Sequence, residues 1–153
     1  MNILALDCGT KTGYATNLLN GEGSGVVDFK PKARESGGMR FLRFASWLSE
    51  MFDLVKPSVV TYEMPHNRGG SATEVLNGMV AIVQKECASR GIEYTSVHSA
   101  TLKKFATGSG RANKEDMIQA CNDKLSKSVK DDNEADALWL LEYAKEEFGR
   151  EGK

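Results

Sequence analysis

Residues 2–17 read NILALDCGTKTGYATN, and this stretch decides the fold class of the chain. The apolar run NILALD ends in a carboxylate at Asp7, and the glycine-containing segment CGTKTG follows it. The next segment, TGYATN, has the composition of a second strand. A third strand, GSGVVDF over residues 23–29, comes after the turn GEGSG. Three short strands joined by tight glycine turns predict an antiparallel meander.

The rest of the chain alternates between helical and extended patterns. Apolar residues recur at helical spacing over about 36–55, and SVVTYE over residues 58–63 predicts a buried strand. Ser71 and Glu74 have the spacing of a capping box at the start of another helix. The remaining predicted elements are helices over 71–90, 99–105, about 114–125 and about 134–148, and a strand over 92–98. This order predicts an α/β fold with a mixed five-stranded sheet and helices on both faces.

The length and composition indicate one soluble domain over residues 1–153. The longest apolar runs are only a few residues, so we expect no membrane span, and the first residues lack the features of a secretory signal. Cys8, Cys87 and Cys121 are far apart and odd in number, which argues against a disulfide framework or a paired-cysteine zinc site. We therefore expect a cytoplasmic protein whose Cys87 and Cys121 face the core.

Charge is distributed unevenly along the chain, although the net charge is only -1. Residues 30–43 carry five basic residues against one acid, and residues 101–130 carry seven against three, so each segment has a net charge of +4. Residues 131–153 have a net charge of -5. The two basic segments are candidate phosphate-binding surfaces, although such runs are often only solvated faces.

Three acids stand where an unused carboxylate would be costly. Asp7 and Glu63 each end a predicted strand, and Asp136 lies on the apolar side of the last predicted helix. An acid at a strand end often only forms a turn or caps a helix. If the three converge, however, their mutual repulsion would favour protonation or a bound divalent metal. The combination of the three predicts a metal site.

Four segments that contain these acids resemble the RuvC family of Holliday junction resolvases. They are ILALDCGTKTGYAT (3–16), VVTYEMPHNRGGSATEVLNGMVAIV (59–83), HSATLKKFATGSGRANKEDM (98–117) and DNEADALWL (132–140). They occur in the order of the family's motifs and cover nearly the whole chain. The resemblance implies an RNase H-like fold.

The resemblance also implies a metal site with two Mg²⁺ or Mn²⁺ ions. Asp7, Glu63 and Asp136 fall on three catalytic carboxylates of the family. The fourth family acid precedes the last by three residues, and Asn133 occupies that position here. Asp132 and Asn133 are near-equal candidates for the fourth ligand, with Glu134 behind them.

Candidate DNA-binding residues are implied in the same way. Lys103 and Lys114 fall on two family lysines associated with catalysis or phosphate contact, and Lys114 is the candidate for stabilising charge at the scissile phosphate. In the loop after Glu63 the family presents an aromatic wedge, where this chain has the less bulky His66. The full set of expected DNA-binding residues is His66, Arg68, Lys103, Lys104, Arg111 and Lys114.

The resemblance implies an endonuclease that resolves four-way DNA junctions by paired symmetric nicks, working as a homodimer. A nuclease for flaps, forks or structured RNA is the main alternative. An ATP-binding or sugar-kinase-like module could use the same DxGT turn, but 153 residues lack the second lobe that such folds need. A catalytically inactive DNA-binding domain is a further alternative.

Overall fold

The structure, a computed structural model, describes residues 1–18, 23–65 and 69–151, with side chains up to Gly149. The described residues form a five-stranded sheet in the order β3-β2-β1-β4-β5. The strands are β1 (Ile3–Asp7), β2 (Lys11–Thr16), β3 (Ser24–Asp28), β4 (Val59–Glu63) and β5 (Glu93–Val97). The helices are α1 (Gly38–Val55), α2 (Gly70–Arg90), α3 (Ser99–Thr107), α4 (Lys114–Leu125) and α5 (Asp132–Glu151).

The sheet combines an antiparallel meander with parallel strands, as predicted. β1 pairs antiparallel with β2, and β2 with β3, while β1 pairs parallel with β4, and β4 with β5. Leu6 of β1 is aligned with Tyr62 of β4. Because the next residues are Asp7 and Glu63, both carboxylates lie at the same edge of the sheet.

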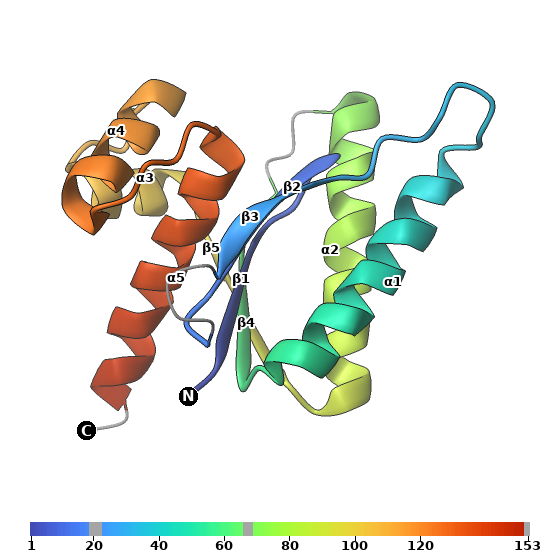
Figure 1. Cartoon of the computed structure of the whole chain (residues 1–153), viewed down its shortest axis with the longest axis horizontal. Coiled ribbons are helices and arrows are strands. Elements are labelled where there is room, and N and C mark those ends of the chain that lie inside the picture. Colours follow the sequence, from blue (N-terminus) through green and yellow to red (C-terminus); the bar gives the residue numbers. More distant parts are fainter. Residues whose placement is uncertain (19–22, 66–68, 152–153) are drawn as a thin grey trace.

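Helices cover both faces of the sheet (Figure 1), and each face has its own core. α1 and α2 lie on one face, and α5 lies on the other with α3 and α4. The alternation of side chains along β1 serves both cores. Ile3 and Ala5 pack into the α5 core, while Leu4 and Leu6 pack into the α1–α2 core. Within the described residues, no helix is both long and apolar enough to cross a membrane.

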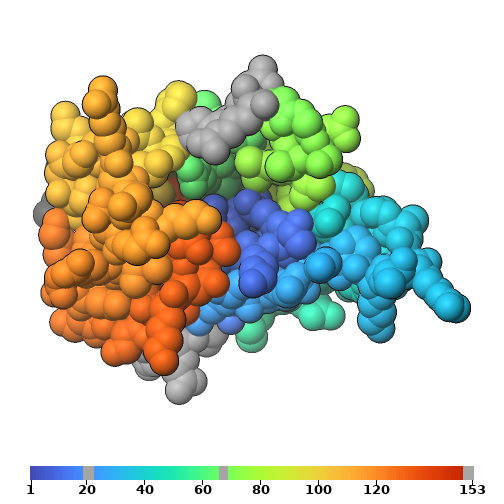
Figure 2. Space-filling model, turned by 90° about the horizontal axis from the view of Figure 1, so that it is seen from above, coloured from blue at the N-terminus to red at the C-terminus, as the bar shows by residue number. Residues whose placement is uncertain are grey.

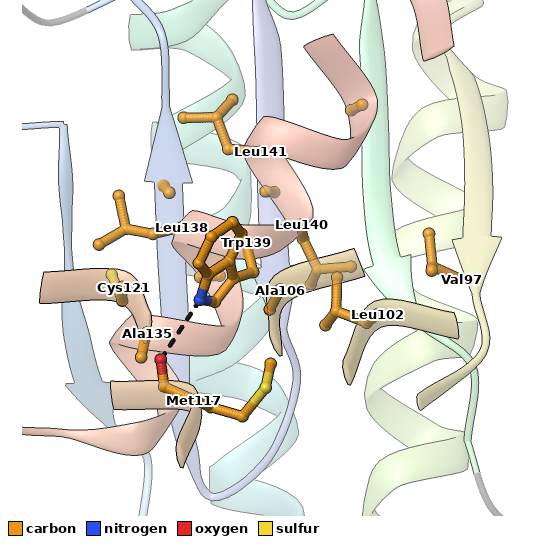
Figure 3. Packing of buried hydrophobic residues seen from close by; sticks show 14 of the residues in the cluster. Val97, Leu102, Ala106, Met117, Cys121, Ala135, Leu138, Trp139, Leu140 and Leu141 are labelled. Atoms are coloured by element: carbon orange, nitrogen blue, oxygen red, sulfur yellow. Dashed lines mark hydrogen bonds between the residues drawn. The ribbon is translucent and has the colours of Figure 1, made fainter. Parts of the chain in front are cut away.

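Trp139 of α5 joins three helices in the α5 core (Figure 3). Its side chain is only 4% exposed, and its indole N–H donates a hydrogen bond of 3.3 Å to the carbonyl of Met117 in α4. The ring of Phe105 in α3 meets it edge to face, with 5.9 Å between the ring centroids. α4 is thereby held against α5, which places the first residue of α4, Lys114, near the start of α5.

The first turn of α5 lies very close to β2 at Gly13. A Cβ atom built at Gly13 would come within 1.9 Å of the carbonyl oxygen of Asn133. Glycine is therefore required at this position because the helix backbone occupies the space of a side chain. The contact holds the acidic start of α5 against the sheet.

The predicted start of α2 is wrong. α2 begins at Gly70, and its N-cap Gly69 provides no side-chain cap in the part of the chain that the structure describes. Both glycines have positive φ, 72° and 82°, so the chain enters the helix before Ser71, which cannot cap it. The predicted capping box of Ser71 and Glu74 is therefore not formed. α5 begins at Asp132, ahead of the predicted start at about 134.

We predict that Gly13→Ala destabilises the protein by about 1–3 kcal/mol, because the added methyl group must displace the start of α5. Urea unfolding followed by circular dichroism would measure this change. Gly149→Ala is the matched control, since a Cβ there meets nothing within 4 Å. Equal free energies of unfolding for the two variants would contradict the close approach.

Candidate metal centre

Three carboxylates from separate elements converge at one edge of the sheet. Among the described residues, Asp7, Glu63 and Asp136 each offer a carboxylate oxygen, and these oxygens lie within 4.8 Å of one another. Asp7 and Glu63 end the parallel neighbours β1 and β4, and Asp136 comes from the second turn of α5. The convergence that the sequence suggested is thus present in the structure.

The start of α5 places Asp136 in this cluster. Asp131, directly before the helix, accepts hydrogen bonds at its Oδ1 from the backbone N–H groups of Asn133 (2.7 Å) and Glu134 (3.3 Å). This carboxylate caps the helix by satisfying two N–H groups that have no partner within it. The Asp131 cap and the close approach at Gly13 together determine where the first turn of α5 lies. Asp136 follows one turn later.

The cluster is electrostatically unfavourable without a cation. Burial, followed by the charges of Asp136 and Glu63, raises the pKa of Asp7 well above its ordinary value of 3.8. Burial, followed by Glu63 and Asp132, raises the pKa of Asp136 to about 7, against the opposing effect of Lys103 and Lys114. Burial and like charge both disfavour ionisation. The fold therefore holds carboxylates together at a cost in stability at neutral pH.

A divalent cation fits this arrangement. Oδ1 of Asp136 is buried and has no hydrogen-bond partner among the described residues. An unpartnered carboxylate oxygen of this kind is costly unless a ligand satisfies it. Hard cations such as Mg²⁺ and Mn²⁺ bind carboxylate oxygens, and here three converge. The donor set suits a divalent metal better than any neutral ligand.

A pocket of about 480 Å³ opens beside the cluster. Charged side chains of both signs line it: Glu63, Lys103, Lys114, Asp132 and Asp136. Nζ of Lys114 lies 3.8 Å from Oδ2 of Asp132, and the Lys114 side chain is 78% exposed. The pocket thus combines carboxylates that suit a cation with lysines that suit an anion, which is the polarity that a metal–phosphate complex requires.

The three candidates for a fourth metal ligand are placed differently. Asp132 lines the pocket with Asp136, because residues four apart share one face of a helix. Glu134 accepts a hydrogen bond of 2.8 Å from the hydroxyl of Ser24 in β3. Asn133 has its backbone against Gly13 and does not line the pocket. This placement favours Asp132 as the fourth oxygen donor.

The expected DNA-binding residues are partly brought together. Lys103 of α3 and Lys114 of α4 both line the pocket, with Lys103 partly buried. Lys104 is exposed on α3, and Arg111 is exposed between α3 and α4, but neither lines the pocket. The remaining two, His66 and Arg68, lie outside the described residues.

Sequence reasoning missed the residues that hold the site in place. Asn113 and Asp116 form a capping box at the start of α4, with reciprocal hydrogen bonds of 2.8 and 3.0 Å that position Lys114. The spacing of NKED, residues 113–116, carried this signal. Asp131 was likewise detectable as a cap before an apolar helix. The role of Gly13 has no such local signal, because it depends on a helix more than a hundred residues away.

No protein-family model matches the sequence, and no curated protein sequence matches it either. Solved structures do match. Thermus thermophilus RuvC superposes with a TM-score of 0.76 at 21% identity, covering 97% of each chain. The T. thermophilus RuvC in complex with a Holliday junction substrate gives 0.77 at 19% identity, covering 99% of this chain and 96% of that one. The yeast mitochondrial Holliday junction resolvase Ydc2 gives 0.57 at 12% identity, covering 99% and 86%.

This chain has the RNase H-like fold of RuvC. The structural similarity to RuvC covers nearly the whole chain, whereas the sequence identity is low. The two proteins are therefore similar in backbone fold and strand order. In this RuvC-like fold the acidic cluster lies beyond the carboxyl ends of β1 and β4. Figure 2 shows that face, with the turn after β1 between the start of α5 and the beginnings of α1 and α2.

Without metal, we predict that the free energy of unfolding of wild type relative to Asp136→Asn falls as the pH rises from about 4 to about 7. The folded-state pKa of Asp136, about 7, lies above the ordinary value of 3.8, so the folded state keeps a proton that the unfolded state has released. At pH 8 the variant should be more stable by on the order of 2 kcal/mol. Urea unfolding across pH measures this difference. Asp123→Asn, an exposed acid on α4, should not reproduce it.

We also predict that Mn²⁺ raises the melting temperature of wild type, and more so at pH 8 than at pH 6, because protons compete with metal for Asp7 and Asp136. Differential scanning fluorimetry with a Mn²⁺ titration would show the shift. Asp7→Asn should abolish most of it, and Asp123→Asn should keep it. A shift of equal size in both variants would place the metal elsewhere.

Proposed function

We propose that this chain, as a single RNase H-like domain, is a divalent-metal-dependent endonuclease that cuts branched DNA. The observation that carries the proposal is the convergence of Asp7, Glu63 and Asp136 within 4.8 Å, in a chain with the fold of RuvC. Three partly buried carboxylates at the edge of the sheet could bind a divalent metal beside a phosphodiester, where the metal would promote its hydrolysis.

Asp7, Glu63 and Asp136 would hold the metal, with Asp132 as the proposed fourth ligand. Two Mg²⁺ or Mn²⁺ ions bound by such a cluster supply Lewis acidity for in-line hydrolysis, which leaves a 5′-phosphate and a 3′-hydroxyl. The carboxylates must be ionised to take up this role. Their raised pKa values therefore couple metal binding, and with it cleavage, to the loss of protons between acidic and neutral pH.

Lys114 lines the same pocket as the carboxylates and would bind the scissile phosphate. Lys114 begins α4, and its ammonium group near Asp132 can approach a phosphate held at the carboxylates. A cation there stabilises the charge that develops in the transition state. Lys103 and the exposed Lys104 and Arg111 would hold neighbouring phosphates without reading bases. His66 and Arg68 remain candidates for DNA contact.

We propose a four-way junction as the substrate and a homodimer as the active form. The T. thermophilus RuvC has been captured with a Holliday junction substrate, and its backbone superposes on 99% of this chain. Resolving a four-way junction takes two symmetric nicks, which a C2 homodimer would deliver with one active site for each strand. We also propose that the protein is located in the cytoplasm.

The test is the cleavage of an end-labelled four-way junction beside a flap, a plain duplex and a hairpin RNA, with Mg²⁺ or Mn²⁺. Wild type should give paired symmetric nicks in the junction, and Asp7→Asn should give none. Lys114→Gln should lower the rate of cleavage about 100-fold at saturating protein, because it removes a charge aimed at the transition state. Asp123→Asn is the control and should cut as wild type does.

If the protein cuts the flap or the RNA in preference to the junction, the metal-dependent mechanism stands, but the four-way junction is not the preferred substrate. A single unpaired nick at the junction would argue against the dimer. Absence of metal-dependent cutting of every substrate would leave a DNA-binding domain without catalysis as the better account.

A further inference from the structure

A second cavity lies on the other side of the beginning of α2 from the metal site. It has a volume of about 370 Å³. It is lined by Cys8, Gly9, Thr10, Arg40, Ala72 and Leu76, with Ser71 and Val75 at the same wall. Ala72 and Leu76 also line the pocket beside the carboxylates, so one face of α2 separates the two spaces. Cys8 and Gly9 directly follow the proposed metal ligand Asp7.

Arg40 is the charged residue among the described residues that line this cavity, and its guanidinium has no hydrogen-bond or ion-pair partner among the described residues. Nε of Arg40 is buried and makes no hydrogen bond to any described residue. The lining residues include no acid. Arg43, three residues later, is different, because its guanidinium binds the carboxylate of Glu35. The Arg40 side chain is partly exposed and lines the cavity, so its positive charge is available to an anion that enters there.

The two helices that meet at the cavity add to its preference for an anion. Arg40 lies in the first turn of α1, where the helix dipole disfavours a cation. α1 and α2 both lack an acid in the first turn, and neither has a side-chain cap among the described residues. Ser71 and Ala72 of the first turn of α2 line the same cavity. The beginning of α2 and an arginine from the first turn of α1 thus line one space.

We propose that this cavity binds a backbone phosphate of the DNA strand that is cut, next to the scissile phosphate, through Arg40. The inference rests on the proposed function. A strand whose phosphate lies at Asp7 continues on both sides of that residue. Lys103 and Lys114 lie on one side of the α2 wall, and Arg40 lies on the other. A guanidinium binds phosphate through two parallel hydrogen bonds, so Arg40 would fix the register of the strand.

A methylphosphonate scan tests the contact directly. Single neutral linkages are placed around the cut site of a four-way junction, and binding is measured with the cleavage-deficient Asp7→Asn protein. One position next to the cut should weaken binding about 10-fold, the effect of losing a charge-assisted hydrogen bond. The same linkage should change binding by less than twofold when Arg40→Gln is added. The contact is refuted if every linkage weakens both proteins equally.

The salt dependence of binding gives a second readout with a matched control. Arg40→Gln should reduce the slope of log K against log salt by about 0.9, because one phosphate contact is lost. Lys85→Gln removes the same charge from an exposed position of α2 outside both cavities, and the slope should not change. Equal slopes for the two variants would overturn the proposal.

Titration of wild type with inorganic phosphate separates this inference from the proposed function and does not depend on the folding of any variant. The amide signals of Gly9, Thr10 and Ser71 should shift in ¹⁵N-edited NMR spectra. Unresponsive amides in a protein that cuts junctions would remove the cavity as an anion site and leave the nuclease intact. If these amides shift but the protein does not bind branched DNA, the cavity binds an anion other than a DNA phosphate. That result would also contradict the proposed function.

Discussion

Helix α5 brings Asp136 to the ends of β1 and β4 because Gly13 of β2 has no side chain. The carbonyl of Asn133 occupies the position of the missing Cβ, at 1.9 Å from where it would lie. With any larger residue the helix would have to move away from the sheet, and the carboxylates would separate. The position of Asp136 in the acidic cluster therefore depends on this approach.

The same closeness makes the site unfavourable in the absence of a ligand. Asp7 and Asp136 have raised pKa values because the fold removes them from water and places other carboxylates beside them. The two apolar cores hold the elements together against this repulsion, one on each face of the sheet. Natural proteins accept such local conflicts where a site has a function, and here a divalent cation would relieve the conflict.

Arg40 is a positively charged residue near the acidic cluster. It lies at the positive end of α1 with no partner among the described residues, and it lines a cavity next to the pocket that holds the carboxylates. The beginning of α2 separates the two spaces and contributes to both. A polyanion with bound divalent cations matches both features at once, since its phosphates suit the arginine and its metals suit the acids.

The sequence by itself determined the succession of strands and helices, the meander and the three candidate acids, because hydrophobic periodicity and glycine turns are local signals. It misplaced the start of α2, where the φ values of Gly69 and Gly70 admit the helix before Ser71. It left Asp132 and Asn133 equal, because only the packing of α5 decides which side chain faces the pocket. The roles of Gly13 and Arg40 appear only in the tertiary structure, since each depends on a distant element or a cavity that the folded chain creates.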